Sequence, residues 1–120
     1  KKALIVNSDD GLDEISPYAN TNVVELNNGN IKEYILNPKE LEIKTNGFEN
    51  IVGKDPKYNA EKIKEIFDGK DNDFSIAVCL NAAGGLLVSE KSNSFKEGYQ
   101  ELRKHILSGK VSNHISKLLK

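Results

Sequence analysis

The sequence predicts an α/β fold in which one buried strand leads, a β-hairpin follows and a cluster of helices completes the chain. Three observations indicate this fold. Residues 3–6 read ALIV, a continuous apolar run of strand type. Residues 21–26 and 31–36 are strand-like and flank the turn sequence NNGN. From residue 58 onward, apolar residues recur at the spacing of a helix face.

The length of 120 residues suits one domain, and we expect residues 1–120 to form a single but partial domain. The sequence contains no methionine and opens directly on a core-like strand, so we interpret it as a piece of a longer protein. Its net charge of −1 lacks the basic excess of a nucleic-acid-binding surface.

The sequence also argues against a membrane or secreted protein. No apolar run approaches the roughly 20 residues that span a bilayer, and no signal peptide is visible. A single cysteine, Cys79, excludes an internal disulfide, and its apolar neighbours predict a small buried side chain. We therefore expect a reducing, cytoplasmic setting.

The first strand is apolar at consecutive positions, which predicts burial on both faces. Upstream strands in a mostly parallel sheet would then be its neighbours. The hairpin follows from two segments rich in strand-forming residues around residues 27–30, where Asn and Gly accept positive φ. Pro38 ends the hairpin and can open a helical turn over residues 38–43. Residues 45–56 are polar, carry two glycines and predict a loop.

Helical spacing dominates the second half of the chain. Ala60, Ile63 and Phe67 share one predicted helix face, with Ile66 beside them and Gly69 closing the segment. Asn72 or Asp73 can cap the next helix, from Phe74 to about residue 91, which is apolar nearly all round and should be buried. A strand over residues 75–80 is the alternative, but the length favours a helix.

Two further helices complete the cluster. Ser94 and Glu97 fit a capping box at the start of an amphipathic helix that ends at Gly109. The apolar face of that helix comprises Phe95, Tyr99, Leu102 and Ile106, at spacings of four, three and four. The last short helix carries Val111, Ile115, Leu118 and Leu119.

The turn after the first strand is acidic: residues 7–16 read NSDDGLDEIS. Its four carboxylates are Asp9, Asp10, Asp13 and Glu14. One interpretation is a divalent-cation site, because Mg²⁺ prefers hard oxygen ligands and ligands bind beyond the carboxyl ends of strands in α/β sheets. The other is a solvated helix start, with Asp10 as N-cap and the later carboxylates favoured by the helix dipole. The ligand spacing of a calcium-binding EF-hand loop is absent.

Other candidate residues favour structural roles. His105 and His114 have no second ligand at metal-binding spacing and should be partly exposed. Gly84-Gly85 lacks the surroundings of a phosphate loop and indicates close helix packing or a kink. Asn81, in an apolar helix, needs hydrogen-bond partners if it is buried. No Ser/His/Asp or Cys/His arrangement is apparent.

Residues 6–14, VNSDDGLDE, resemble the strand and turn of the anthranilate phosphoribosyltransferase family, V-x-H/S-G/S-x-D-G-L-D-E. The likeness continues along essentially the whole chain. Its further motifs are VVEL at 23–26, IKEY at 31–34 with Pro38, Asn59-Ala60, Phe67-x-Gly69, LNAA at 80–83, Glu97-Gly98 and Ser108-Gly109-Lys110. One departure is Asn7-Ser8, where the family often has His-Gly.

The resemblance implies a fold, an activity and a site. The fold would be the C-terminal part of a phosphoribosyltransferase/nucleoside-phosphorylase catalytic α/β domain. The activity would be transfer of phosphoribosyl from phosphoribosyl pyrophosphate to anthranilate, with release of pyrophosphate, in tryptophan biosynthesis. The family uses Mg²⁺, and the carried-over metal ligands would be Asp13 and Glu14; no other catalytic or cofactor-binding residue is carried over. A metal there would stabilise the leaving pyrophosphate.

In that family the glycine-rich phosphate loop, most anthranilate contacts and the helical dimerisation domain lie upstream of the matching segments. We therefore expect the isolated chain to be inactive and its parent to be a cytoplasmic homodimer that binds no nucleic acid and no membrane. Two alternatives remain: a pyrimidine-nucleoside phosphorylase on the same fold, and a non-catalytic nucleic-acid-binding relative on that scaffold. The Asp-Glu pair after Gly11-Leu12 disfavours the first alternative, and the net charge disfavours the second.

Overall fold

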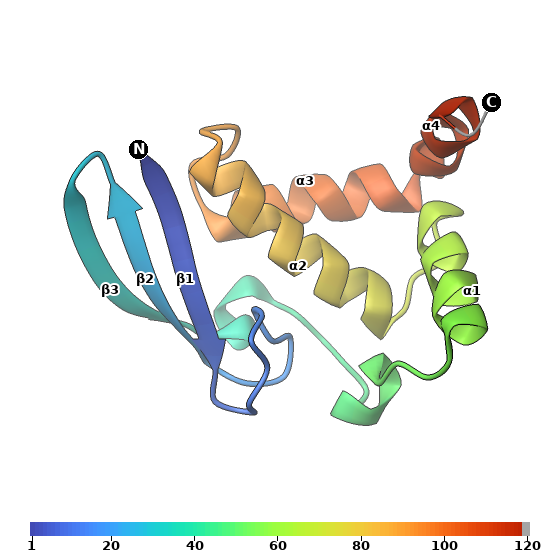
Figure 1. The fold of residues 1–120 in the computed structure, drawn as a ribbon, viewed down its shortest axis with the longest axis horizontal. Coiled ribbons are helices and arrows are strands. Elements are labelled where there is room, and N and C mark those ends of the chain that lie inside the picture. The colour runs from blue at the N-terminus through green and yellow to red at the C-terminus, as the bar shows by residue number, and fades with distance from the viewer. Residues whose placement is uncertain (119–120) are drawn as a thin grey trace.

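The computed structural model describes residues 1–118, which form a three-stranded sheet followed by helices (Figure 1). The strands are β1 (Lys2–Ser8), β2 (Thr21–Asn27) and β3 (Asn30–Leu36). The short 3₁₀ helices are η1 (Pro38–Leu41) and η2 (Phe48–Ile51). The α-helices are α1 (Pro56–Phe67), α2 (Asp73–Val88), α3 (Phe95–Leu107) and α4 (Lys110–Leu118). The predicted fold class, a strand, a hairpin and a helical cluster, is therefore confirmed; Leu119 of the last predicted helix lies outside the described residues.

The hairpin forms where the sequence predicts it. β2 and β3 pair antiparallel around Asn28 and Gly29, whose φ angles of 51° and 92° are the positive values that a tight hairpin turn requires. β1 pairs antiparallel with the other edge of β2, so the sheet order is β1-β2-β3. Pro38 opens the short helix η1, as predicted, with the Asn37 side chain as its N-cap.

The structure corrects the prediction for the first strand. The strands within residues 1–118 pair antiparallel throughout, and a mostly parallel sheet with upstream strands stays a prediction. β1 is buried on one face only: Leu4 and Val6 pack against the core, whereas Ile5 is 70% exposed on the other face. The reason is that helices cover one side of this sheet, so an apolar run does not by itself determine how many faces are covered.

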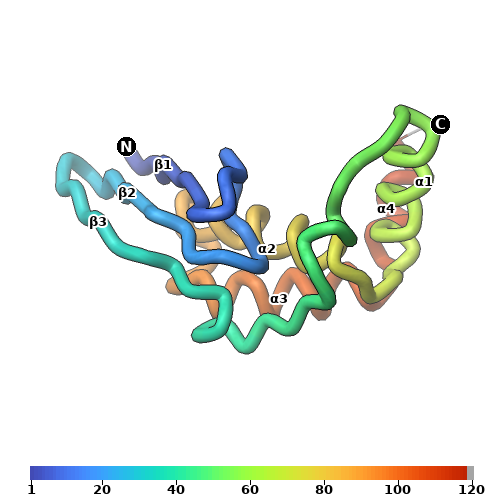
Figure 2. Tube along the Cα trace, turned by 90° about the horizontal axis from the view of Figure 1, so that it is seen from below, coloured from blue at the N-terminus to red at the C-terminus, as the bar shows by residue number. Residues whose placement is uncertain are grey.

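The helices form two further layers beside the sheet. Figure 1 shows α2 and α3 crossing in the middle of the molecule, with α2 next to β1. Seen at right angles, α1 and α4 lie side by side at the end far from the sheet (Figure 2). The core lies between these layers and comprises Ile15, Leu41, Ile66, Ile76, Cys79, Leu80, Ala83, Phe95, Tyr99 and Ile106. None of the helices within residues 1–118 is both long and apolar enough to cross a membrane.

α2 is the central helix, and the prediction of a helix rather than a strand over residues 75–80 is confirmed. Asn72 caps it in a reciprocal capping box with Ser75, and Asp73 is its first helical residue. The nearly all-apolar sequence predicts a fully buried helix, but in the described part of the chain one side of α2 is exposed. The stripe Val78, Ala82 and Gly85 faces outward there and is exposed.

The flanking helices follow the sequence to different degrees. The helix predicted from residue 58 is confirmed as α1; on it Ile66 is buried, whereas Ala60 and Ile63 of the predicted apolar face are exposed. On α3, the predicted apolar face is confirmed, and Ser94 is the N-cap. The Glu97 carboxylate accepts from the Asn93 backbone N–H instead of the Ser94 N–H, so only half of the predicted capping box forms.

Candidate functional site

The acidic turn between β1 and β2 is irregular backbone, not a helix start. The Asp10 carboxylate accepts hydrogen bonds from the Leu12 backbone N–H, at 3.3 Å, and from the Ser16 hydroxyl. Asp10 therefore stabilises the turn through a local Asx-type contact. The interpretation of this segment as a solvated helix with Asp10 as its N-cap is wrong.

A buried group of hydroxyls holds the two ends of the turn together. Ser8 Oγ, at the end of β1, donates to the Glu14 carbonyl at 2.7 Å and lies 2.7 Å from Thr21 Oγ1, at the start of β2. The Ser16 backbone N–H donates to Ser8 Oγ at 3.0 Å. We refer to Ser8, Ser16 and Thr21 as the hydroxyl cluster; all three residues are at most 2% exposed. Their hydrogen bonds satisfy backbone groups that would otherwise be buried without a partner.

The side chain of Asn81, on α2, forms hydrogen bonds with the same turn. Its Oδ1 accepts from the Ile15 backbone N–H and its Nδ2 donates to the Ile15 carbonyl, both at 2.9 Å. Nδ2 also donates to the Ala77 carbonyl at 3.0 Å. The predicted structural hydrogen bonding of Asn81 is therefore confirmed, and its partner is the residue that follows Glu14.

Asp13 and Glu14 are adjacent, and both line the rim of one hollow of about 630 Å³. The other residues around it are mostly apolar: Leu12, Ile15, Pro17, Ile51, Phe74, Ala77, Val78 and Asn81. Both carboxylate residues are exposed. Within residues 1–118, no lysine or arginine forms an ion pair with either carboxylate. Both side chains are therefore accessible to a ligand from solvent.

The donor set suits one kind of metal ion. Two carboxylates offer hard oxygens, and the described part of the chain contains no group of three or more His, Cys, Asp or Glu residues that could enclose a metal. A closed structural zinc or calcium site therefore does not fit these residues. Mg²⁺ does fit, because proteins usually bind it through one or two carboxylates while water and phosphate oxygens complete its shell.

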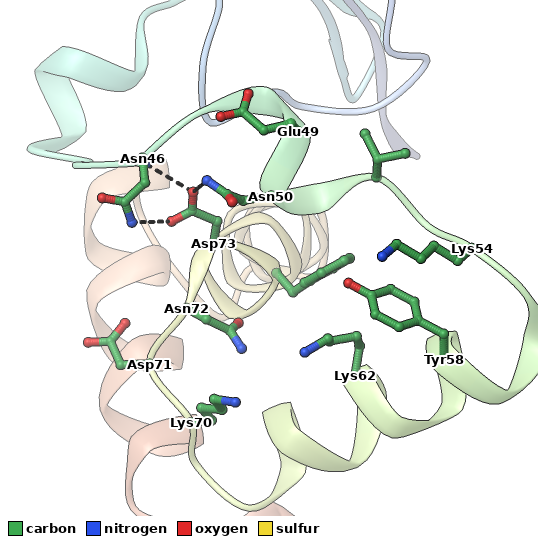
Figure 3. Close-up of a pocket in the computed structure, with 12 residues that line it drawn as sticks. Asn46, Glu49, Asn50, Lys54, Tyr58, Lys62, Lys70, Asp71, Asn72 and Asp73 are labelled. Carbon is green, nitrogen blue, oxygen red and sulfur yellow. Dashed lines mark hydrogen bonds between the residues drawn. The ribbon is translucent and has the colours of Figure 1, made fainter.

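A second hollow, of about 910 Å³, lies at the N-terminal end of α2 (Figure 3). At its edge Asp73, only 4% exposed, accepts four hydrogen bonds: from the Asn46 backbone and side chain, from Asn50 Nδ2 and from the Tyr18 hydroxyl, at 3.0–3.3 Å. Burial, and then the hydrogen bond to Asp73, raise the pKa of Tyr18 well above its ordinary value. Across the hollow, Lys54 and Lys62 lie over the Tyr58 ring, 4.7 and 5.3 Å from its centroid.

The sequence did not single out Asp73 or the hydroxyl cluster as parts of a site. The spacing of residues along the sequence does not indicate that Tyr18 and the loop at residues 46–50 meet at the N-terminus of one helix. The only available indication was that Asp73 directly follows a strong N-cap residue.

The remaining candidates lie in the surroundings that the sequence predicts. His105 and His114 are exposed, and Cys79 is buried, which raises the pKa of its thiol and disfavours the reactive thiolate. Gly84 serves close packing: a Cβ there would lie 3.4–3.5 Å from side-chain carbons of Ile15, Phe95 and Leu4. α2 continues through both glycines as one helix.

Comparison with known proteins connects this arrangement to one family. The family model described as "Glycosyl transferase family, a/b domain" matches residues 1–112. The chain is 58% identical over 118 residues to the anthranilate phosphoribosyltransferase of Pelagibacter ubique (strain HTCC1062), covering 98% of this chain and 36% of that protein. It is 38% identical over 120 residues to the enzyme of the same name from Pseudoalteromonas translucida (strain TAC 125), covering 99% and 34%.

Solved structures agree with the sequence relatives. The anthranilate phosphoribosyltransferase of Thermus thermophilus superposes with a TM-score of 0.84 at 28% identity, over 97% of this chain and 34% of that one. The Saccharomyces cerevisiae enzyme in complex with PRPP and Mg superposes with a TM-score of 0.78 at 26% identity, over 92% and 32%. The chain thus spans about a third of the length of the relatives it matches.

Proposed function

The chain belongs to the glycosyl transferase family through its match to the model of the a/b domain, and from that membership we propose that it is a portion of an anthranilate phosphoribosyltransferase. In the full-length protein it would serve the transfer of phosphoribosyl from phosphoribosyl pyrophosphate to anthranilate, with release of pyrophosphate. Residues 1–120 would form one structural part of the catalytic α/β domain. Support comes from the agreement of the sequence relatives with the solved structures, one of which is an S. cerevisiae enzyme in complex with PRPP and Mg.

Within that function, Asp13 and Glu14 would hold Mg²⁺. The observation that carries this assignment is their shared position: two adjacent, exposed carboxylates, without an ion pair in the described residues, on the rim of one hollow. A further S. cerevisiae relative is described with Mg bound. When bound, the metal would stabilise the negative charge that develops on the departing pyrophosphate.

The test uses the full-length protein that contains this chain. We expect Asp13→Ala and Glu14→Ala each to weaken Mg²⁺-dependent binding of phosphoribosyl pyrophosphate, measured by calorimetry, by about tenfold or more. Turnover with anthranilate should fall in parallel. Asp9→Ala is the matched control: Asp9 lies on the same turn, but its carboxylate accepts from Asn22 Nδ2 at 3.2 Å. Wild-type binding and turnover in both variants would remove the metal assignment.

The same assay separates the alternatives. The isolated chain should show no turnover, because two carboxylates leave most of a Mg²⁺ shell and both substrates without protein contacts. Phosphorolysis of a pyrimidine nucleoside by the full-length protein, without transfer to anthranilate, would favour the nucleoside phosphorylase. Dimerisation through a domain outside this chain and a cytoplasmic location stay predictions from the resemblance.

A further inference from the structure

We propose that Asn81 is a positioning residue for the Asp13–Glu14 pair, an inference that rests on the metal role proposed above. Asn81 does not serve as a third ligand beside the carboxylates. It acts from a separate helix on the backbone that carries them, and it does so through Ile15, the next residue along the chain.

The Asn81 amide is fully used in one orientation. Oδ1 accepts from the Ile15 N–H, and the two Nδ2 hydrogens go to the Ile15 and Ala77 carbonyls, at 2.9, 2.9 and 3.0 Å. A rotated amide would place its oxygen against two carbonyls, so only this orientation satisfies all three partners. Asn81 therefore pairs with both polar backbone groups of one residue, as a neighbouring strand would, and fixes where that residue lies.

The adjoining backbone groups are held as well. The Glu14 carbonyl accepts from Ser8 Oγ on β1 at 2.7 Å, and the Ser16 N–H reaches Ser8 Oγ and Thr21 Oγ1 at 3.0 and 3.2 Å. Three elements, β1, β2 and α2, thus hold the chain from Glu14 to Ser16. The Ile15 side chain, 3% exposed, packs into the core beneath this segment.

This arrangement places the exposed side chain of Glu14, with Asp13 directly before it, next to a backbone segment that is held by hydrogen bonds. Four acidic residues within six positions repel one another, and a free turn would spread them apart. A metal site gains affinity when its ligands already lie in the binding geometry, because less ordering remains for the metal to impose. Asn81 supplies the link between the turn and the most central helix of the molecule. Asn81 would thereby contribute to metal affinity although it lies far from Asp13 and Glu14 in the sequence.

The test compares Asn81→Ala and Asn81→Asp with wild type in the full-length protein. Asn81→Asp keeps an acceptor for the Ile15 N–H but places a carboxylate oxygen against the Ile15 carbonyl. Metal affinity is measured without turnover, by titrating Mn²⁺ into the protein alone and following the free ion by electron paramagnetic resonance. We expect the affinity to fall by about tenfold in both variants. Amide hydrogen exchange at Ile15 should become faster in both.

Two further variants make the result specific. Ser8→Ala removes the neighbouring bond to the Glu14 carbonyl and should weaken Mn²⁺ binding in the same direction, even if Asn81→Ala does not fold. Ser75→Ala is the control: Ser75 is fully buried on the same helix, but it bonds Asn72 and Arg103 and does not touch the turn. It should lower thermal stability without changing Mn²⁺ affinity.

Wild-type Mn²⁺ affinity in folded Asn81→Asp and Ser8→Ala, while Asp13→Ala still loses it, would overturn this inference and leave the proposed metal site standing. Wild-type affinity in Asp13→Ala and Glu14→Ala would overturn the metal site itself, and with it any positioning role. The two failures are therefore distinguishable in one set of titrations.

Discussion

Asp73 shows how a single buried carboxylate can organise two loops at once. It stands at the first position of α2, where the helix dipole favours a negative charge, and donors reach it from Tyr18 and from the loop containing Asn46 and Asn50. Tyr18 follows the acidic turn, and η2 supplies Ile51 to the hollow beside Glu14. Asp73 therefore joins the segment after the acidic turn to the loop that supplies Ile51 to this hollow.

Replacing the Asp73 carboxylate should destabilise the folded protein. Asp73→Ala leaves four donors without their acceptor, and we expect the free energy of unfolding to fall by about 2–4 kcal/mol. Urea unfolding followed by circular dichroism measures it. The control is Glu101→Gln, on the exposed side of α3, which should stay within about 0.5 kcal/mol of wild type. Equal stability of the two variants would contradict the role of Asp73.

Tyr34 gives the molecule a pH-dependent component of stability. Burial, and then a hydrogen bond to Glu25, raise the pKa of Tyr34 to about 12. The phenol of an unfolded chain titrates near about pH 10, so the folded state holds this proton more tightly. The contribution is complete below about pH 10 and is lost as the pH rises towards 12.

We therefore expect the free energy of unfolding to decrease between about pH 10 and pH 12, with Tyr18 adding in the same direction. In Tyr34→Phe the decrease should be smaller, because no proton is lost at that position. Urea unfolding at several pH values measures both proteins. The same decrease in wild type and variant would show that Tyr34 is not responsible.

At the scale of elements, α2 carries two neighbouring glycines with opposite surroundings. Gly84 faces the core, where side chains of Ile15 and Phe95 leave room for no more than a methyl group. Gly85 is exposed on the outward stripe, and a Cβ there would meet nothing within 4 Å. The same residue type thus serves packing at one position and only weakens the helix at the next.

This contrast predicts opposite effects. Gly85→Ala should stabilise the protein by about 0.5–1 kcal/mol, because alanine loses less conformational freedom in a helix interior. Gly84→Leu should destabilise it by about 1–3 kcal/mol through overpacking against β1 and α3. Thermal unfolding of both variants tests the pair, and stabilisation by Gly84→Leu would contradict the close packing described for α2.

Sequence reasoning succeeded for elements whose causes are local. The hairpin follows from the Asn28-Gly29 turn chemistry, and α2 and α3 follow from their caps and apolar spacing. It failed for the burial of β1 and α2, because exposure of Ile5 and Val78 depends on which other elements cover them. The Asp13–Glu14 pair was visible as a motif, but the hydroxyl cluster that holds it depends on contacts between strands and could not be read locally.

At the scale of the whole molecule, one face of the sheet is apolar and is left exposed by the rest of residues 1–118. The pairing of Ile5 with Val24, and of Val24 with Glu33, places Ile5 on the same face as Ile31 and Ile35. The exposed fractions of Ile5, Ile31 and Ile35 are 70%, 70% and 62%. An apolar surface of this kind is unusual for a protein that has no contacts there.

We expect the isolated chain to bind an apolar fluorescent dye such as anilinonaphthalene sulfonate through this face. The double variant Ile31→Thr/Ile35→Thr should reduce dye binding, because threonine keeps strand propensity while adding a polar group. Circular dichroism checks that the fold is retained. Unchanged dye fluorescence in a folded double variant would place the binding surface elsewhere.

The pairing of Ser8 with Thr21 limits which changes of chain length the site can accept. Side chains alternate along a strand, so one residue added to or removed from β1 would turn Ser8 to the opposite face of the sheet. Asn7 or Asp9 would then stand where the Glu14 carbonyl now finds its donor. Insertions or deletions at the hairpin turn, Asn28-Gly29, would not change the face on which Ser8 lies and would not move the carboxylates. Among natural or engineered versions of this chain, variation in length should accordingly collect at the hairpin tip and avoid residues 2–8.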